Sequence, residues 1–164
     1  MERIQANAAG AANDDGEAPS PTSRLDLGPL PGFVGYMLRR AQLLVFDDFI
    51  KTMSAVGLRP ASFSVLAVID ANPGSTQSAV SEALGLQRTN LVAIIDTLER
   101  GGYARREPVK TDRRSHALYL TPEGKKLLDK ALKLQADHEA RLLRKLGKDD
   151  SRQLLDLLRR LVED

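Results

Sequence analysis

The chain has 164 residues, enough for one domain or for one domain with a tail. Hydrophobic residues make up 42% of it and aromatic residues 4%, so aliphatic side chains must form most of any core. Cysteine is absent, which excludes disulfides, thiolate metal sites and cysteine-based redox switching. The apolar runs are too short to cross a bilayer and no secretory stretch is visible, so we expect a cytoplasmic protein without a membrane partner.

The formal net charge of +2 is unevenly distributed along the sequence. Acidic residues outnumber basic ones in residues 1–31, whereas basic residues dominate in residues 86–116. A local basic excess suggests a polyanionic partner more strongly than the total charge does. The alternative is an ordinary solvated charged face.

Residues 1–30 are rich in small and polar types and have no apolar period, so we expect a disordered tail. From Gly32 onwards apolar residues recur every three or four positions, which predicts a long amphipathic helix. This helix is expected to end near Gly57. We interpret residues 31–57 as a first dimerisation helix.

Pro60 suits the first turn of a second helix, and the run Asn72-Pro73-Gly74 ends it. Ser75 is expected to cap a third, short helix that Gly85 terminates. The residues expected to face inward are Phe63, Leu66 and Ile69 in the second helix and Ala79, Val80, Ala83 and Leu84 in the third.

A fourth helix is predicted from about Gln87 to the Gly101-Gly102 pair. Its inward positions, at helical spacing, are Leu91, Ile94, Ile95 and Leu98. Two short strands follow, joined by a charged loop, at Tyr103–Pro108 and Ser115–Thr121. Residues 58–121 are therefore expected to form one lobe, a helix-turn-helix with a hairpin.

Thr121-Pro122-Glu123 combines a capping hydroxyl, a proline at the first helical position and an acid near the positive end of the helix dipole. The helix that follows is expected to have one apolar face, formed by Leu127, Ala131, Leu134, His138 and Leu142. After Gly147 a last helix contains Leu154, Leu155, Leu157, Leu158, Leu161 and Val162. Left exposed, this cluster would form an interface-sized patch, so residues 122–164 are interpreted as C-terminal dimerisation helices. The alternative is a monomer whose terminal helices fold back on the lobe.

The outer face of the fourth helix is the candidate DNA-reading surface. Its first turn offers side chains that can bond base edges or phosphates: Gln87, Arg88, Thr89 and Asn90. Val92 and Ala93 come next and point outward or sideways, where apolar atoms can meet thymine methyl groups. A small patch without function is the alternative for these two residues.

Two further groups of residues are candidate DNA contacts. In the hairpin loop they are Lys110, Arg113 and Arg114, because an arginine there can reach a narrow minor groove. A solvated charged loop is the alternative. At the start of the third helix the candidates are Ser75, Thr76 and Gln77.

Several runs taken together and in order resemble the winged helix-turn-helix (wHTH) domain of MarR-type regulators. They are Arg59-Pro60-Ala61-Ser62-Phe63-Ser64-Val65-Leu66, Leu84-Gly85-Leu86, Leu98-Glu99-Arg100-Gly101-Gly102-Tyr103, Arg105-Arg106, Asp112-Arg113-Arg114-Ser115 and Leu118-Tyr119-Leu120-Thr121-Pro122-Glu123-Gly124. The fifth run matches the family's Asp-x-Arg-Ser/Ala signature, and the resemblance covers about residues 32–164.

The resemblance implies a mainly α fold with a small β-hairpin wing and a wHTH lobe between N- and C-terminal dimerisation helices. It implies a homodimer whose lobes bind successive major grooves of a pseudo-palindromic operator in double-stranded DNA, and a small-molecule effector pocket between those helices and each lobe. Two departures are visible. Arg59 stands where the family usually has a capping Thr or Ser, and Val92 and Ala93 replace residues that are often polar.

Regulators of this type are often released from DNA by phenolic or carboxylate ligands. The candidate effector contacts are Phe33, Tyr36, Arg39, Arg40 and Phe63, in which an arginine holds an anionic group and the rings line an apolar slot. An aromatic carboxylate or its bulkier thioester is the expected ligand. Exposed arginines and core aromatics are the alternative. His138 is interpreted as a packing histidine, with a ligand contact as the other reading.

An enzyme is not expected, because the sequence has no nucleophile elbow, phosphate-binding glycine loop or zinc-binding His-Glu-x-x-His run. No cofactor or metal is expected either. We expect a sequence-specific transcriptional regulator, most simply a repressor that an effector releases. The alternatives are an architectural DNA-binding protein of low specificity and a protein-interaction module that has lost DNA binding.

Overall fold

The computed structural model describes residues 25–109 and 112–163, and for Val109 and Asp112–Ser115 only the backbone is described. Residues 1–24, most of the expected tail, lie outside this description. Chain contacts define two compact units, one up to Met37 and one from Leu38 onwards. The first contains the short 3₁₀ helix η1 (Leu30–Gly32) and the start of helix α1 (Val34–Met53).

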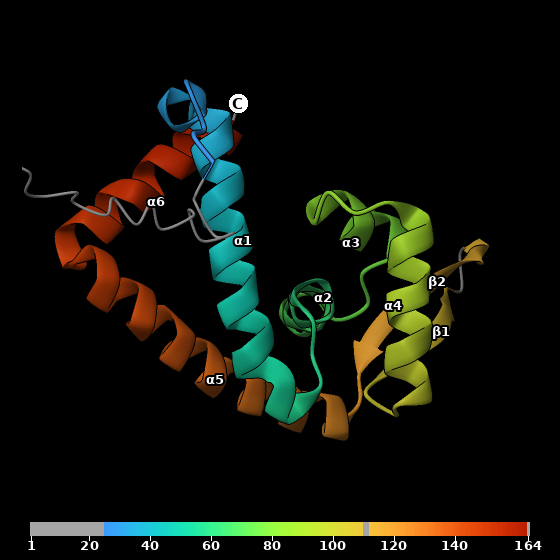
Figure 1. Cartoon of the computed structure of the whole chain (residues 1–164). Coiled ribbons are helices and arrows are strands. Elements are labelled where there is room, and N and C mark those ends of the chain that lie inside the picture. The colour runs from blue at the N-terminus through green and yellow to red at the C-terminus, as the bar shows by residue number, and fades with distance from the viewer. Residues whose placement is uncertain (1–24, 110–111, 164) are drawn as a thin grey trace, which may run out of the picture. The chain divides into compact units, whose positions relative to one another are not determined.

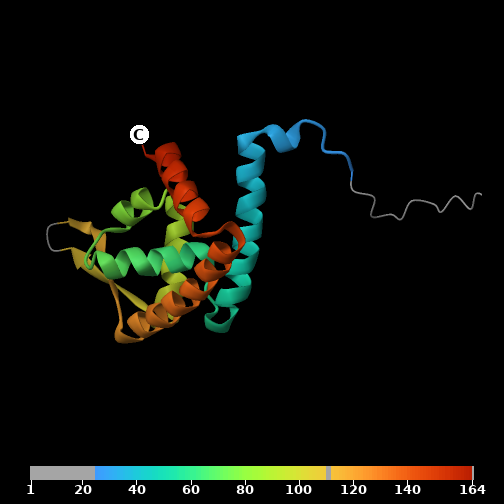
Figure 2. The ribbon, with the colours of Figure 1, turned by 90° about the vertical axis from the view of Figure 1, so that its left-hand side faces the viewer.

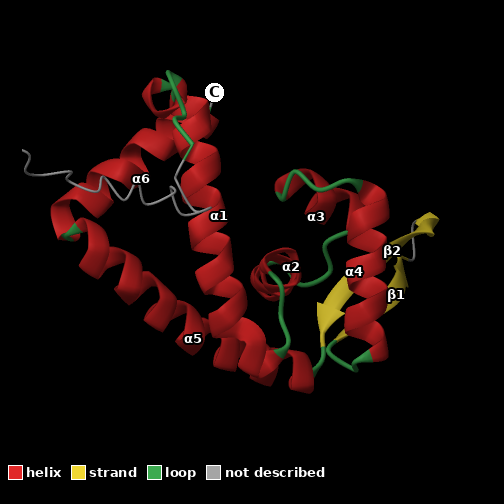
Figure 3. Ribbon diagram, viewed as in Figure 1, coloured by secondary structure: helices red, strands yellow, loops and turns green. Residues whose placement is uncertain are grey.

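The second unit is built mainly of helices with one antiparallel hairpin (Figures 1 and 3). After α1 come η2 (Ser54–Val56), α2 (Pro60–Ala71), α3 (Gln77–Ala83), α4 (Arg88–Arg100), β1 (Ala104–Val109), β2 (Asp112–Leu120), α5 (Pro122–Leu146) and α6 (Lys148–Val162). This order confirms the expected mainly α fold with a hairpin wing. The second strand begins three residues earlier than expected, at Asp112 rather than Ser115.

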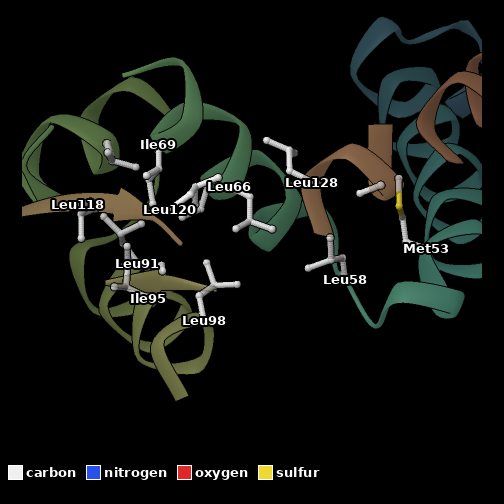
Figure 4. Packing of buried hydrophobic residues seen from close by; sticks show 14 of the residues in the cluster. Met53, Leu58, Leu66, Ile69, Leu91, Ile95, Leu98, Leu118, Leu120 and Leu128 are labelled. Atoms are coloured by element: carbon white, nitrogen blue, oxygen red, sulfur yellow. The ribbon is translucent and has the colours of Figure 1, made fainter. Parts of the chain in front are cut away.

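Aliphatic side chains form the core of the lobe (Figure 4). Leu66 and Ile69 of α2 pack with Leu91, Ile95 and Leu98 of α4, and the cluster continues through Leu118 and Leu120 of β2 to Leu128 of α5. Each of these side chains is at most 8% exposed. Burial of a large aliphatic side chain contributes about 1.5–3 kcal/mol, so this cluster holds α2, α4, the hairpin and the start of α5 together.

The turn between α3 and α4 depends on Gly85, whose φ of 60° lies in the left-handed region that favours glycine. The buried Ser81 closes the turn, because its hydroxyl donates to the Leu86 carbonyl at 2.6 Å and its own carbonyl accepts from Leu86 N at 2.9 Å. This hydrogen-bonded turn sets the direction in which α4 leaves α3.

The cap of α3 differs from expectation. Thr76, not Ser75, is the N-cap, and its hydroxyl accepts from Ala79 N. Ser75 is used instead by the sheet: its carbonyl accepts from Leu118 N at 2.9 Å, and Thr76 bridges Ala117. Residues 74–76 thus extend the edge of the hairpin, which shifts the helix start by one residue.

Burial in α3 also differs. Val80 is buried and Leu84 half-buried as expected, but Ala79 and Ala83 are exposed. A helix of two turns has one narrow inward face, which here is completed by Ser81. In α4 the inward set is confirmed, with Ile94 half-buried and the other three residues buried.

Helix α5 begins as predicted. The Thr121 hydroxyl accepts from Gly124 N at 3.0 Å and donates to the Gly102 carbonyl at 2.6 Å. Thr121 N also donates to the Tyr103 carbonyl, so the start of α5 is fastened to the turn before the hairpin. On the apolar face Ala131 and His138 are buried, whereas Leu127, Leu134 and Leu142 are half-buried and Leu128 is an additional buried residue.

Within the described residues, no single helix is both long and apolar enough to cross a membrane. Only α1 with η2 and α2, taken together as a bent pair, reach the required length and composition. The buried residues of α2, Val65, Leu66 and Ile69, belong to the core.

Candidate nucleic-acid interface

The first turn of α4 presents an uninterrupted polar surface. Gln87 is the N-cap residue without forming a side-chain cap, and Arg88, Thr89 and Asn90 follow it. All four residues are exposed, as the DNA-reading interpretation requires. The side chains of Leu91, Ile95 and Leu98 hold the opposite face of α4 in the core. The helix therefore has one fixed side and one side open to a partner.

Val92 and Ala93 occupy the open side as well. Val92 is 40% exposed, and Ala93 is exposed beside it. Side chains of this kind have no hydrogen bonds to offer, and in a major groove they can contact a thymine methyl group. Their exposure fits the expected outward or sideways orientation.

A hollow of about 200 Å³ lies where α3, α4 and β2 meet. It is lined by Thr76, Gln77, Ser78, Arg88, Leu91, Val92 and His116. The structure thus brings candidate contacts from α3 and α4 together around one hollow, whereas the sequence analysis treated them as separate groups. The sequence analysis did not identify His116 as a candidate contact. Alternation along the strand was the available signal, because His116 precedes the buried Ala117 and therefore faces outward.

Ser75 is the candidate contact that the geometry disfavours. Its hydroxyl oxygen is buried and has no hydrogen-bond partner among the described residues. A buried hydroxyl cannot meet a DNA backbone without movement of the chain. Thr76 is half-buried, and its hydroxyl is occupied as the cap of α3.

The two arginines of β1 are engaged within the protein. Arg105 pairs with Glu107 and lies over the Tyr119 ring, 4.7 Å from its centroid. Arg106 pairs with Glu99 and, at 2.7 Å, with Asp96 of α4. The basic excess between residues 86 and 116 is therefore partly neutralised internally. Arg88 stays a candidate for a phosphate contact, as do Lys110, Arg113 and Arg114, whose side chains the structure does not describe.

The hairpin formed by β1 and β2 lies at one side of the second unit (Figure 2). Lys110 lies outside the described residues, while Arg113 and Arg114 belong to β2. The strand register jumps from Pro108 opposite His116 to Val109 opposite Asp112. The backbone of Arg113 and Arg114 therefore lies in the irregular part of the hairpin.

The candidate effector residues have different surroundings. Phe33 is exposed and Tyr36 half-buried in the unit up to Met37, and Arg39 and Arg40 are exposed on α1. Phe63 of α2 is half-buried and packs edge-on against Phe49, with ring centroids 5.7 Å apart. The core contact of Phe63 agrees with the alternative interpretation of this residue as a core aromatic.

A polar cluster joins α1 to α5. The His138 ring is 1% exposed, and its Nδ1 lies 2.6 Å from Asp48 Oδ2. Arg141 donates to both Asp48 oxygens at 2.9–3.2 Å and also contacts the Thr52 hydroxyl. His138 is thus a packing histidine with a satisfied polar atom, as expected, and its ring also lies edge-on to Phe49.

This cluster predicts an acid-sensitive contribution to stability. The Arg141 guanidinium and, secondly, His138 lower the pKa of Asp48 below its ordinary value of 3.8. A carboxylate with a lowered folded pKa stabilises the fold above its ordinary pKa, and the contribution disappears as pH falls through the folded value. We expect Asp48→Asn to be less stable than wild type in urea unfolding at pH 7. The difference should shrink below about pH 4.

Asp47→Asn is the matched control for that experiment, because Asp47 pairs with Lys51 on the exposed side of the same helix. Such a pair contributes little. A difference between wild type and Asp48→Asn that stayed constant down to pH 2 would show that the ionised carboxylate does not stabilise the fold.

The lobe contains the three helices α2, α3 and α4, and the β1–β2 hairpin adjoins them. One face of α4 is held in the core and the other is exposed. This arrangement defines a winged helix-turn-helix protein. Residues 56–115 match the family model described as the MarR family. The chain belongs to the MarR family.

Similar proteins agree with this assignment. A proposed transcriptional regulator of the hcr operon from Thauera aromatica is 32% identical over 88% of this chain and 87% of its own. The HTH-type transcriptional regulator PecS of Dickeya dadantii is 30% identical over 84% of this chain and 85% of its own. The chain is thus similar to transcriptional regulators.

Solved structures of the repressor CouR are also similar. CouR bound to a 23-mer DNA duplex is 45% identical, with a TM-score of 0.82, over 86% of this chain and all of that chain. CouR bound to p-coumaroyl-CoA is 42% identical, with a TM-score of 0.80, over 85% of this chain and 99% of that chain. The expectation of a DNA-binding transcriptional regulator is confirmed.

Proposed function

We propose that this protein is a homodimeric, sequence-specific repressor that a coenzyme A thioester of an aromatic acid releases from its operator. The observation on which the DNA-binding part rests is the open face of α4, where exposed polar residues adjoin the hollow next to β2. Such a protein acts in the cytoplasm, where the bacterial chromosome lies.

The proposed DNA contacts come from two described elements and from the hairpin tip. They are Thr76, Gln77, Gln87, Arg88, Thr89, Asn90, Ala93, Lys110, Arg113 and Arg114, with Val92 and His116 beside them. The first turn of α4 would bond base edges and phosphates, and the hairpin arginines would enter a minor groove. Ser75 is left out because its hydroxyl is buried.

The effector proposal has a chemical basis. Arg39 and Arg40 are exposed cationic side chains that suit phosphate groups, while Phe33 and Tyr36 offer rings for an aromatic acyl group. Phe63 is kept as a candidate lining residue. The likeness to CouR, which binds p-coumaroyl-CoA, favours the thioester over the free aromatic carboxylate.

Gel-shift titration of the intergenic DNA beside the protein's own gene tests this function. We expect binding at least ~10³-fold tighter than to random DNA of equal length. Addition of p-coumaroyl-CoA should release the complex, and free coenzyme A is the control. Equal affinity for both DNAs would favour an architectural DNA-binding protein without an effector. If binding is specific but neither the thioester nor p-coumarate affects it, the protein is a repressor whose effector belongs to another chemical class.

Arg114→Ala is expected to weaken operator binding and to flatten its salt dependence. Removal of one phosphate contact lowers the slope of log K against log salt by roughly one unit. The measurement is a titration of the same duplex at several salt concentrations. Arg100→Ala, on the last turn of α4, is the control of equal charge. An unchanged slope for Arg114→Ala would remove this residue from the interface.

A further inference from the structure

Arg106 of β1 meets three side chains from two helices. Its Nη2 lies 2.7 Å from Asp96 Oδ1, and its Nη1 contacts Glu99 Oε2. Its Nε and Nη2 lie 2.5 and 3.1 Å from the side-chain amide of Gln77. The Arg106 backbone N–H also donates to Glu99 Oε1 at 2.8 Å. The Arg106 side chain is only 19% exposed, so it is a poor candidate for a phosphate contact.

The contact with Arg106 fixes the orientation of the Gln77 amide. A guanidinium has only donors, so the group that faces it must be the amide oxygen. The NH2 group of Gln77 then occupies the other in-plane position of the amide and does not face the guanidinium. Gln77 also lines the hollow with Arg88, Val92 and His116, beside the exposed first turn of α4.

The positive charge of Arg106 is compensated within the protein. Asp96 and Glu99 compensate the positive charge of Arg106, so the cluster can be held at the α3–α4–β1 junction without binding an anion. A charged donor to an amide oxygen is a stronger hydrogen bond than a neutral one. Rotation of the Gln77 amide by half a turn would place two sets of donors against each other.

We propose that Arg106 is a positioning residue for DNA recognition, which holds Gln77 so that its NH2 donates to a hydrogen-bond acceptor of DNA in the hollow. This inference rests on the proposed function, since it requires that the α3–α4 face binds DNA. The acceptor is either a phosphate oxygen or a purine N7, and both present a lone pair to an amide donor.

Gln77→Glu separates positioning from folding. Glutamate keeps two acceptors for Arg106 but has no donor, and it turns a neutral contact into an ion pair. The new ion pair with Arg106 is offset by repulsion from Asp96 and Glu99, so we expect a melting temperature close to that of wild type, together with about tenfold weaker operator binding. Gln77→Met, of similar length and without charge, should weaken binding to a similar extent at high salt. High salt screens the repulsion between DNA and the new carboxylate of Gln77→Glu. It does not restore the hydrogen bond that both variants have lost.

Modified DNA identifies the acceptor. The duplex that wild type binds is prepared with single methylphosphonate or 7-deazapurine replacements along each half-site. We expect one replacement to weaken wild-type binding about tenfold and to have no effect on Gln77→Met. Arg106→Lys, whose single nitrogen lacks the planar fork of donors that spans Asp96, Glu99 and Gln77, should lose sensitivity at that same position. A methylphosphonate signal assigns a phosphate, and a 7-deazapurine signal assigns a base.

The outcomes separate this proposal from the proposed function. If Gln77→Glu binds DNA like wild type, the positioning role is wrong. It is also wrong if Arg106→Lys weakens binding to every modified duplex equally and stays sensitive to the replacement at the Gln77-dependent position. DNA binding by wild type then still supports the proposed function. If wild type shows no preference for any duplex, the proposed function itself is wrong.

Discussion

Replacing both Leu157 and Leu161 by aspartate is expected to convert the protein into a monomer that binds operator DNA about 10²–10⁴-fold more weakly. Both side chains are on α6 and are 49% and 62% exposed in the single chain. Leu154, Leu155 and Val162 extend the same apolar face. Two linked lobes bind two half-sites with an avidity that a single lobe does not have, so loss of pairing costs more than any single DNA contact.

The apolar surface extends beyond α6. Large hydrophobic residues are exposed on α1, and they include Leu43, Leu44, Phe46 and Ile50. A soluble monomer rarely leaves so much aliphatic surface in water, which supports residues 31–57 and 122–164 as pairing segments. These boundaries remain a proposal. The start of α5 is also part of the lobe core, because Leu128 and Ala131 are buried there.

Sedimentation velocity and gel-shift titration check the aspartate variant. Gln153→Asp is the control, because it adds one negative charge on an exposed, polar position of the same helix. Circular dichroism at the concentrations used would establish that the variant is folded. A double variant that sediments as a dimer with wild-type affinity would exclude the exposed face of α6 from the subunit interface.

Gly124→Ala is expected to destabilise the protein by about 3 kcal/mol or more, because it overfills a fully packed contact. A Cβ at this position would lie 1.9 Å from the Tyr103 carbonyl oxygen and 2.8 Å from its carbon. Both are backbone atoms, so no side chain can rotate away. The Tyr103 carbonyl is itself held by Thr121 N at 3.0 Å.

Thermal unfolding should show this as a fall in midpoint of about 6–12 °C for a chain of this size. Lys126→Ala, on the exposed side of the same helical turn, should change stability by less than ~0.5 kcal/mol. If the alanine variant melts with wild type, α5 does not lie against the Gly102–Tyr103 turn as closely as described.

Local patterns in the sequence were sufficient for most of the architecture. Thr121-Pro122 marks the start of α5, Asn72-Pro73-Gly74 ends α2, and Arg59 precedes α2 without a side-chain cap, each as predicted. The signals involved are capping hydroxyls, fixed proline φ angles and apolar periodicity, which act within one or two turns. The α3 cap was misplaced because pairing of Ser75 with Leu118 is a contact over 43 residues of sequence.

The polar clusters show more clearly that local patterns do not predict contacts between distant segments. Asp48 and His138 are 90 residues apart, and periodicity identified only that His138 lies on an apolar face. Similarly, Arg105 and Arg106 belong to the basic segment in the sequence, but their partners in the fold are acidic side chains and an aromatic ring. Charge counting cannot distinguish an arginine that is free to meet phosphate from one that is already paired.

The junction between hairpin and long helix has a mechanical consequence. Strand β2 ends at Leu120 and α5 begins at Pro122, so only the capping Thr121 separates them. Because Thr121 is bonded on both sides, to Gly102 and Gly124, this joint contains no slack segment that could absorb a change in direction. A tilt of the first turns of α5 is therefore expected to move the wing in the same direction.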